Sequence, residues 1–318
     1  MTQPSTTASP PKGPVFIVGA PRSGTTLLQY RLRNHPRISL PTGESHFFIP
    51  LLAREAEFGD LRDAQNIARV LQAMHRQSKE FLETDLHGMK FDIGRLAMEL
   101  AAEGRHSVAA IISGIFEKNA LGEGKMRWGD KTPYYVLHLP TLLRWWPDAQ
   151  FIHIIRDGRD VALSLLGRRH DFRVYNFFTA GEYWKRYVEK GHAHGSPLRP
   201  DQYLEVRYEA LLADPEGTLR RICEFLGEEY LDKLLDVEAV DAPGKTPLVH
   251  QPIKPDNAGK WRQKMTSLQV RVFEAAAGDT LSRFGYELAT HEGPLFPGLA
   301  TAYRLHNRIA TAYWRQHR

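Results

Sequence analysis

A glycine loop between a predicted strand and a predicted helix is the feature that most constrains the fold of this chain. An apolar run covers residues 15–18, and the loop Pro21-Arg-Ser-Gly-Thr-Thr-Leu-Leu28 opens a segment with helical periodicity. Four residues separate Gly19 from Gly24, which is the spacing of a P-loop. A strand followed by such a loop and a helix predicts an α/β protein with a cradle for a phosphate group.

The loop departs from the ATP-binding P-loop at one position. Where that motif has lysine, this chain has Thr25, and the only cation in the loop is Arg22. An ordinary Mg-ATP substrate would therefore lose its main β/γ contact. The loop still suits a dianionic group on a 5′-ribose. Such a group can be bound by the backbone N–H groups of residues 22–26, by the positive end of the helix, and by the hydroxyls of Thr25 and Thr26. The loop therefore predicts a nucleotide other than Mg-ATP.

Length and composition favour one α/β domain with short extensions. The 318 residues are enough to bury one large core. The Pro/Ser/Thr-rich residues 1–13 are expected to be a disordered tail, residues 14–290 the main domain, and residues 291–318 a basic amphipathic extension. Cys223 is the only cysteine, which excludes an internal disulfide and favours a cytoplasmic location. No apolar run approaches the length of a membrane span.

The periodicity predicts a mostly parallel sheet flanked by helices. A short second strand is expected at residues 38–40, and the helical pattern of residues 49–124 indicates an insertion after that strand. In such sheets, ligands collect at the carboxyl ends of the strands. Further strands are predicted at 151–155 and 203–206, a tight turn at 129–133, and helices at 27–34, 136–146, 161–166 and from 208 onward.

A second anion site is predicted after the strand at residues 151–155. Arg156 follows this strand directly, and Ser164 lies about two helical turns further on, on a similar face. Arg168 extends that face by four residues. Together these side chains can surround a terminal phosphate monoester with charge-assisted donors. The alternative is a surface ion pair between Arg156 and Asp157, with Ser164 serving the turn.

These residues resemble the sulfotransferases that use 3′-phosphoadenosine-5′-phosphosulfate (PAPS). The loop at 21–26 is similar to the family's 5′-phosphosulfate motif, in the arginine-bearing form of protein-tyrosine and many bacterial enzymes, and residues 151–166 are similar to the 3′-phosphate motif. The resemblance extends from residue 14 to about 288, and the acceptor-choosing segments 49–124 and 172–200 show little of it. It implies cofactor contacts from Arg22, Ser23, Gly24, Thr25, Thr26, Arg156, Ser164, Arg168, Tyr208 and Lys260.

Sulfuryl transfer requires a base for the acceptor hydroxyl and a cation near the leaving phosphate. Glu44 is the candidate base, because it matches the glutamate of the Glu-x-x-Phe-Phe segment in similar enzymes. The alternative is that Glu44 caps a helix starting near Ser45, and His46 is the rival base. Lys131 is the candidate cation, with Asp130 as its expected partner, against the alternative of a solvated loop lysine.

No metal is expected at the predicted site. Arg22, Lys131 and the loop amides can neutralise a phosphosulfate, and the sequence has no clustered carboxylates or His/Cys spacing typical of metal sites. The net charge of +5 is scattered along the chain, which favours anionic ligands over a nucleic-acid groove.

Two further segments leave alternatives open. Aromatic residues between 172 and 187 either line an acceptor pocket or, as packing alone favours, form a helix core. Residues 299–318 carry arginines among apolar residues and no acidic residue. Such a helix binds a membrane surface or a partner subunit such as a second copy, or it packs back onto its own domain, which is the favoured interpretation. The aromatic residues are Phe172, Tyr175, Phe177, Phe178, Tyr183, Trp184 and Tyr187.

The sequence therefore predicts a cytoplasmic PAPS-dependent sulfotransferase. Its catalytic residues are expected to be Glu44, Lys131 and Arg22, and its acceptor a hydroxyl of a carbohydrate, lipid, small metabolite or peptide tyrosine. One alternative is a small-molecule kinase that uses Arg22 in place of the missing lysine and requires Mg²⁺. The other is a non-catalytic module that binds the nucleotide without transferring anything.

Overall fold

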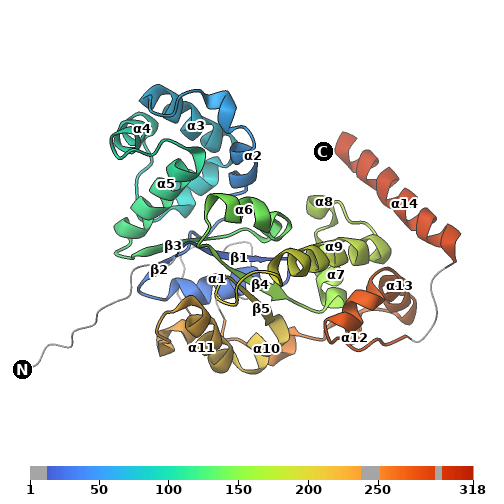
Figure 1. The fold of residues 1–318 in the computed structure, drawn as a ribbon. Helices are drawn as coiled ribbons and strands as arrows, with labels where there is room; N and C mark the ends of the chain where they lie inside the picture. The colour runs from blue at the N-terminus through green and yellow to red at the C-terminus, as the bar shows by residue number, and fades with distance from the viewer. Residues whose placement is uncertain (1–12, 238–250, 291–295, 318) are drawn as a thin grey trace, which may run out of the picture.

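The computed structural model describes residues 13–237, 251–290 and 296–317 (Figure 1). The disordered tail predicted for residues 1–13 lies outside the described residues, apart from Gly13. The same holds for residues 291–295 and 318 of the predicted C-terminal extension.

Five strands form one parallel sheet in the order β2-β3-β1-β4-β5. The central β1 strand is buried along its whole length, as expected for a parallel strand covered on both faces. Phe16 and Val18 belong to the apolar core on one face, and Val15 and Ile17 to the core on the other. The predicted parallel α/β sheet is confirmed. The strands are β1 (Val15–Gly19), β2 (Ile38–Ser39), β3 (Arg127–Lys131), β4 (Gln150–Ile155) and β5 (Tyr203–Arg207).

Strand β3 corrects the sequence-based prediction of a tight turn at residues 129–133. Asp130 pairs with Phe16, and Lys131 pairs with Ile17, so the segment continues as a buried strand. The turn was predicted from glycine and proline, whereas the pairing depends on β1, more than a hundred residues away in the sequence. The extra strand carries Lys131 to the carboxyl edge of the sheet.

Helices cover both faces of the sheet (Figure 1). One core cluster joins β1, α1, α10 and α11, and Cys223 is buried in it, as its position in an amphipathic helix predicts. The other joins the opposite face to α5, α6, α7 and α9. The helices in question are α1 (Thr25–Arg33), α5 (Val108–Gly122), α6 (Leu139–Trp145), α7 (Gly158–Gly167), α9 (Phe177–Gly195), α10 (Tyr208–Ala213) and α11 (Pro215–Leu226).

The predicted helical insertion after the second strand is confirmed, and it shares its core with the sheet. The ring of Phe48 lies 6.2 Å from that of Phe16 and 5.3 Å from that of Phe116, measured between centroids. These contacts make the insertion a continuous part of the main domain. Besides α5 it contains α2 (Phe48–Leu52), α3 (Ala64–Gln77) and α4 (Ile93–Ala102), with shorter turns at Glu55–Phe58 and Phe81–Asp85.

Helix α9 carries most of the aromatic segment singled out in the sequence. Phe178, Trp184 and Tyr187 are buried, which confirms the favoured core interpretation for these three residues. The indole Nε1 of Trp184 donates to the carbonyl of Arg156 at 3.0 Å, so this core helix also positions the end of β4. The remaining helices are α8 (Arg169–Phe172), α12 (Trp261–Lys264), α13 (Ser267–Arg283) and α14 (Pro297–Gln316), with shorter turns at Pro133–His138, Asp232–Leu235 and Pro255–Asn257.

Candidate active site

The glycine loop after β1 leaves an open helix N-terminus. Gly24 precedes α1 with φ 99°, and no side chain caps the helix. Arg22 also has a positive φ, 72°, which is uncommon for a non-glycine residue and typical of functional loops. The prediction that residues 22–26 all offer N–H groups is wrong for Ser23, whose N–H donates to the carbonyl of Ala20 at 3.1 Å. The open first turn still suits an anion.

Tyr208 fills the space above the loop because Gly24 has no side chain. A Cβ atom on Gly24 would lie 2.3 Å from Cδ2 of Tyr208, well inside van der Waals contact. The guanidinium carbon of Arg156 lies 4.5 Å from the centre of the same ring. A cation over an aromatic face is attracted to it, so Tyr208 links the glycine loop to the end of β4.

The structure brings the two predicted phosphate motifs together. Nε of Arg22 donates to Oγ of Ser164 at 2.8 Å, across 142 residues of sequence. Burial, then the charges of Arg168 and Arg156, lower the pKa of Arg22. Three guanidinium groups within mutual electrostatic reach favour a bound anion between them.

Arg168 does not lie where the helical spacing predicts. Helix α7 ends at Gly167, so Arg168 is its C-cap and leaves helical geometry. Its side chain is 43% exposed and pairs with Asp171 at 2.8 Å. Arg168 therefore does not continue the face of Ser164, although its charge contributes to the lowered pKa of Arg22.

The alternative of a surface Arg156–Asp157 ion pair is wrong. Asp157 pairs with Arg159 at 2.7 Å and accepts a hydrogen bond from the backbone N–H of that residue, which starts α7. Arg156 lies 3.4 Å from Asp160 instead, between Nη2 and Oδ2. Nη1 of Arg156 lies 3.5 Å from the carbonyl oxygen of Arg22, so this guanidinium also faces the glycine loop.

Asp160 and Asn257 connect Arg156 to the loop of Lys260, and neither was predicted from the sequence. The carboxylate of Asp160 accepts from the backbone N–H groups of Gly259 at 2.7 Å and Trp261 at 2.8 Å. The carbonyl of Asn257 accepts from Nη2 of Arg156 at 2.7 Å, and its side-chain oxygen accepts from Nζ of Lys260. These bonds attach the loop that carries Lys260 to the end of β4. The available signal was the second aspartate of the Arg156-Asp-Gly-Arg-Asp160 motif.

Glu44 lies between Lys131 and His46 at the carboxyl ends of β2 and β3. Lys131 Nζ is 2.7 Å from Glu44 Oε1, and His46 Nε2 is 3.0 Å from Glu44 Oε2. The capping alternative is wrong, because α2 begins at Phe48 and has no side-chain cap. The solvated-lysine alternative is also wrong, because the side chain of Lys131 is only 3% exposed.

The two cationic partners control the charge of Glu44. Burial alone raises the pKa of Glu44, but Lys131 and the hydrogen bond from His46 outweigh burial and lower the pKa to about 2. A carboxylate held this way is ionised and ready to accept a hydrogen bond, yet it is a weak base while Lys131 remains its partner.

Asp130 is not the partner of Lys131. Adjacent residues of a strand point to opposite faces, so the ammonium of Lys131 meets Glu44 while Asp130 is buried on the other side. Burial raises the pKa of Asp130 to about 6.

This raised pKa predicts a pH-dependent stability difference. In the folded state the pKa of Asp130 is about 6, above its ordinary value of 3.8, so protonation of Asp130 favours the folded state. This contribution to the free energy of unfolding is fully present below pH 3.8 and is lost as the pH rises through 6. Asp130→Asn removes that dependence. The unfolding free energy of the variant minus that of the wild type is expected to rise by on the order of 2 kcal/mol between about pH 4 and pH 7, in urea titrations. Asp148→Asn, at an exposed position, is the control, and a flat difference for Asp130→Asn would contradict this assignment.

Two tyrosines of α9 lie within electrostatic reach of Glu44. Burial raises the pKa values of Tyr183 and Tyr187, and the negative charge of Glu44 adds to both shifts. Their rings are stacked with centroids 4.7 Å apart, and the Tyr183 hydroxyl donates to that of Tyr187 at 3.1 Å. Tyr183 and Tyr187 therefore form a stacked aromatic pair on α9.

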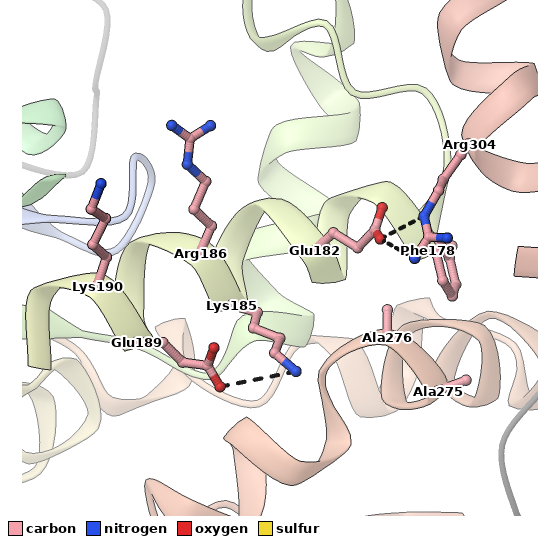
Figure 2. A pocket seen from close by; sticks show the side chains of 9 residues that line it. All are labelled: Phe178, Glu182, Lys185, Arg186, Glu189, Lys190, Ala275, Ala276 and Arg304. Atoms are coloured by element: carbon pink, nitrogen blue, oxygen red, sulfur yellow. Dashed lines mark hydrogen bonds and ion pairs between the residues drawn. The ribbon is translucent and has the colours of Figure 1, made fainter. Parts of the chain in front are cut away.

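A separate groove of about 530 Å³ lies between α9, α13 and α14 (Figure 2). Four of its six charged side chains form ion pairs, Glu182 with Arg304 at 2.8 Å and Lys185 with Glu189 at 4.0 Å. Figure 2 shows the other two, Arg186 and Lys190, on the side of α9 opposite Lys185 and Glu189. None of the lining residues belongs to the phosphate motifs, so the groove is distinct from the candidate site.

A parallel α/β sheet with two basic loops at its carboxyl edge defines a protein with a P-loop-like fold. A model of the sulfotransferase family matches residues 14–232, and the chain belongs to that family. Protein-tyrosine sulfotransferase 1 of Danio rerio is 27% identical over 286 residues, covering 86% of this chain and 72% of its own length. Its human counterpart is 26% identical, with 86% and 69% covered.

A solved structure shares the fold. The sulfotransferase domain of the Synechococcus PCC 7002 olefin synthase superposes with a TM-score of 0.58 and 25% identity, covering 91% of this chain and 100% of that domain. Among the described residues, no helix combines the length and apolar character needed to cross a membrane.

Proposed function

We propose that this protein transfers a sulfuryl group from PAPS to a hydroxyl acceptor. The observation that carries the proposal is the junction of the two motifs, where Arg22 bonds Ser164 and Arg156 lies over Tyr208. A donor with phosphate groups at both its 5′ and 3′ positions matches two basic loops at one sheet edge. The proposed reaction takes place in the cytoplasm, as the single cysteine favours.

The donor contacts follow from the two loops. The 5′-phosphosulfate would be held by Arg22, by the N–H groups of Gly24, Thr25 and Thr26, and by the hydroxyls of the two threonines. The buried Oγ of Ser23 and Nε of Arg156 have no hydrogen-bond partner among the described residues, which fits sites that await a polar ligand. The 3′-phosphate would lie against Arg156, Ser164 and Arg168, with Tyr208 and Lys260 closing over the nucleotide.

Glu44 would take the proton of the acceptor hydroxyl as its oxygen attacks sulfur. The S–O bond to the phosphate breaks, and the electron pair and charge go to the leaving 3′-phosphoadenosine 5′-phosphate (PAP). Lys131 and Arg22 stabilise that charge. These cations occupy the role that Mg²⁺ fills in a kinase, so the proposed transfer is metal-independent.

The contact between Lys131 and Glu44 supports an ordered reaction. When a donor phosphosulfate draws Lys131 away, Glu44 loses the partner that lowers its pKa and becomes a stronger base. His46 remains at the second oxygen of Glu44 and offers a path for the proton toward solvent, because its side chain is 51% exposed. Acceptor activation would thus follow donor binding.

The acceptor would enter from the side of the helical insertion and α9. The insertion holds the backbone next to the base, because Ser78 Oγ donates to the carbonyl of Ser45 at 2.8 Å and Gln77 Nε2 to that of His46 at 3.3 Å. Tyr183 gives this side an aromatic surface. The proposal covers carbohydrate, lipid, small-metabolite and peptide-tyrosine hydroxyls, the last being the group named for the protein-tyrosine relatives.

Calorimetry with PAP and AMP tests the donor site. PAP is expected to bind at least ~10²-fold more tightly than AMP, because the 3′-phosphate adds charge-assisted hydrogen bonds. Arg156→Gln should remove most of that preference and leave AMP binding nearly unchanged, whereas Arg144→Gln, on the exposed side of α6, should preserve it. Equal affinities of the wild type for PAP and AMP would contradict the proposal.

Transfer assays separate the alternatives. Labelled sulfate passing from PAPS to hydroxyl compounds in the presence of EDTA would support the proposed reaction. Mg²⁺-dependent phosphate transfer from ATP would favour a kinase. Tight binding of PAP without transfer to any acceptor would favour a non-catalytic nucleotide-binding module.

A further inference from the structure

Helix α14 is attached to the domain along one side only. Figure 1 shows it running beside α8 and α9 at the edge of the molecule. The carbonyl of Tyr303 accepts from Asn176 Nδ2 at 2.9 Å, and Asn307 Oδ1 accepts from the N–H of Tyr175 at 2.8 Å. The ring of Trp314 lies 4.5 Å from that of His170. These contacts confirm that the helix packs back onto its own domain. Within the described residues, its opposite side is uncovered.

The uncovered side is apolar. Leu305, Ile309 and Tyr313 are four residues apart and therefore share one face, where they are 55%, 61% and 53% exposed. Of the ten large apolar side chains that are exposed in the described part of the chain, six lie between residues 296 and 314. Exposed apolar side chains gathered in this way indicate an interaction surface.

A basic strip borders this face. At about 100° per residue, Arg304, Arg308 and Arg315 lie within about 40° of one another and about 120° around the helix from the centre of the apolar face. Residues 297–316 contain no aspartate or glutamate. Arg304 pairs with Glu182, but no carboxylate of the described residues pairs with Arg308 or Arg315. Within the described part of the chain, these two charges are open to an anionic partner.

The charge of α14 decides between two partners for this face, a second copy of the chain and a lipid surface. A second copy packing α14 against α14 would place arginines near arginines with no acidic residue on either helix to compensate. A lipid surface with anionic headgroups accepts the apolar side chains and the arginines at the same time. We propose that α14 lies in the plane of an anionic lipid surface, with Leu305 and Ile309 inserted and Arg308 and Arg315 at the headgroups.

Co-sedimentation of the full chain with vesicles tests this proposal. Binding to vesicles that contain phosphatidylglycerol is expected to be at least ~10-fold stronger than binding to pure phosphatidylcholine vesicles, and to weaken as salt is added. Equal binding to both vesicle types, or binding to neither, would overturn the proposal.

Paired variants show which residues are responsible. Leu305→Ser with Ile309→Ser, and separately Arg308→Gln with Arg315→Gln, are each expected to lower binding to anionic vesicles by at least ~10-fold. Leu121→Ser is the matched control, because Leu121 is 77% exposed on α5 and should leave vesicle binding unchanged. A different result would contradict the proposal: a dimer in sedimentation that the Leu305/Ile309 variant converts to a monomer, with no binding of either form to vesicles. The apolar face would then be covered by a second copy of the chain.

Discussion

Glu44→Gln is expected to lower kcat for sulfuryl transfer by ~10² to 10⁴-fold while leaving the affinity for PAP nearly unchanged. The amide keeps the size of the side chain and an oxygen that faces Lys131, but it cannot take the acceptor proton. Steady-state rates with PAPS and calorimetry with PAP measure the two effects separately. A comparable loss in rate and in PAP affinity would show that Glu44 holds the donor instead of activating the acceptor.

The contact between Glu44 and His46 makes His46→Asn the informative comparison. If Glu44 is the base, the histidine variant should lose much less activity than Glu44→Gln, on the order of 10-fold, because it removes only the partner at the second oxygen. The reverse order of effects would identify His46 as the base. Glu57→Gln, at an exposed ion pair with Arg54, is the control for changing a glutamate without touching the site.

Gly24→Ala is expected to weaken PAP binding by on the order of 10²-fold or more. The added Cβ would meet Tyr208 at 2.3 and 2.5 Å, and a positive φ of 99° is unfavourable for alanine. Because Tyr208 contacts Arg156, the displaced ring would disturb both phosphate loops together. Calorimetry with PAP measures the loss.

Gly124→Ala is the control that separates the effect of backbone strain from the effect of the clash with Tyr208. Gly124 also has a positive φ, 70°, but a Cβ there meets nothing within 4 Å. This variant should lose about 1 kcal/mol of unfolding free energy and bind PAP like the wild type. If Gly24→Ala bound PAP as tightly as Gly124→Ala, the close packing of Tyr208 on the loop would have no part in donor binding.

Much of the fold could be predicted from the sequence because its signals are local. The apolar run at 15–18, the glycine spacing and the helical start after Gly24 depend on neighbouring residues only, and the structure has β1, a loop and α1 there. The same reasoning failed at residues 129–133. The register with Phe16 and Ile17 makes that segment a strand, and no property of the five residues themselves indicates this pairing.

In the candidate site too, local sequence signals predicted some residues, and contacts between distant segments revealed others. Arg22 and Arg156 were selected by their position after strands, Ser164 by its helical spacing from Arg156, and Glu44 by its resemblance to similar enzymes. The structure brings Arg22 to Ser164, Arg156 to Tyr208 and Glu44 to Lys131. Asp160 and Asn257 were missed, because their partners are the backbone N–H groups of residues 259 and 261 and a guanidinium 101 residues away. The aspartate of the Arg156-Asp-Gly-Arg-Asp160 motif marked a charged residue, but its type did not indicate a backbone partner so far away in the sequence.

Residue types and their spacing were sufficient to predict a P-loop-like glycine loop with threonine at the lysine position and Arg22 as its only cation, a parallel sheet, and charged side chains at its edge. The pairing of Lys131 with Glu44, the bond from Arg22 to Ser164 and the one-sided attachment of α14 followed only from the packed chain. The physical reason is range: periodicity and turn chemistry act over a few residues, whereas a pKa, an ion pair or an uncovered face depends on which distant segments the core brings together.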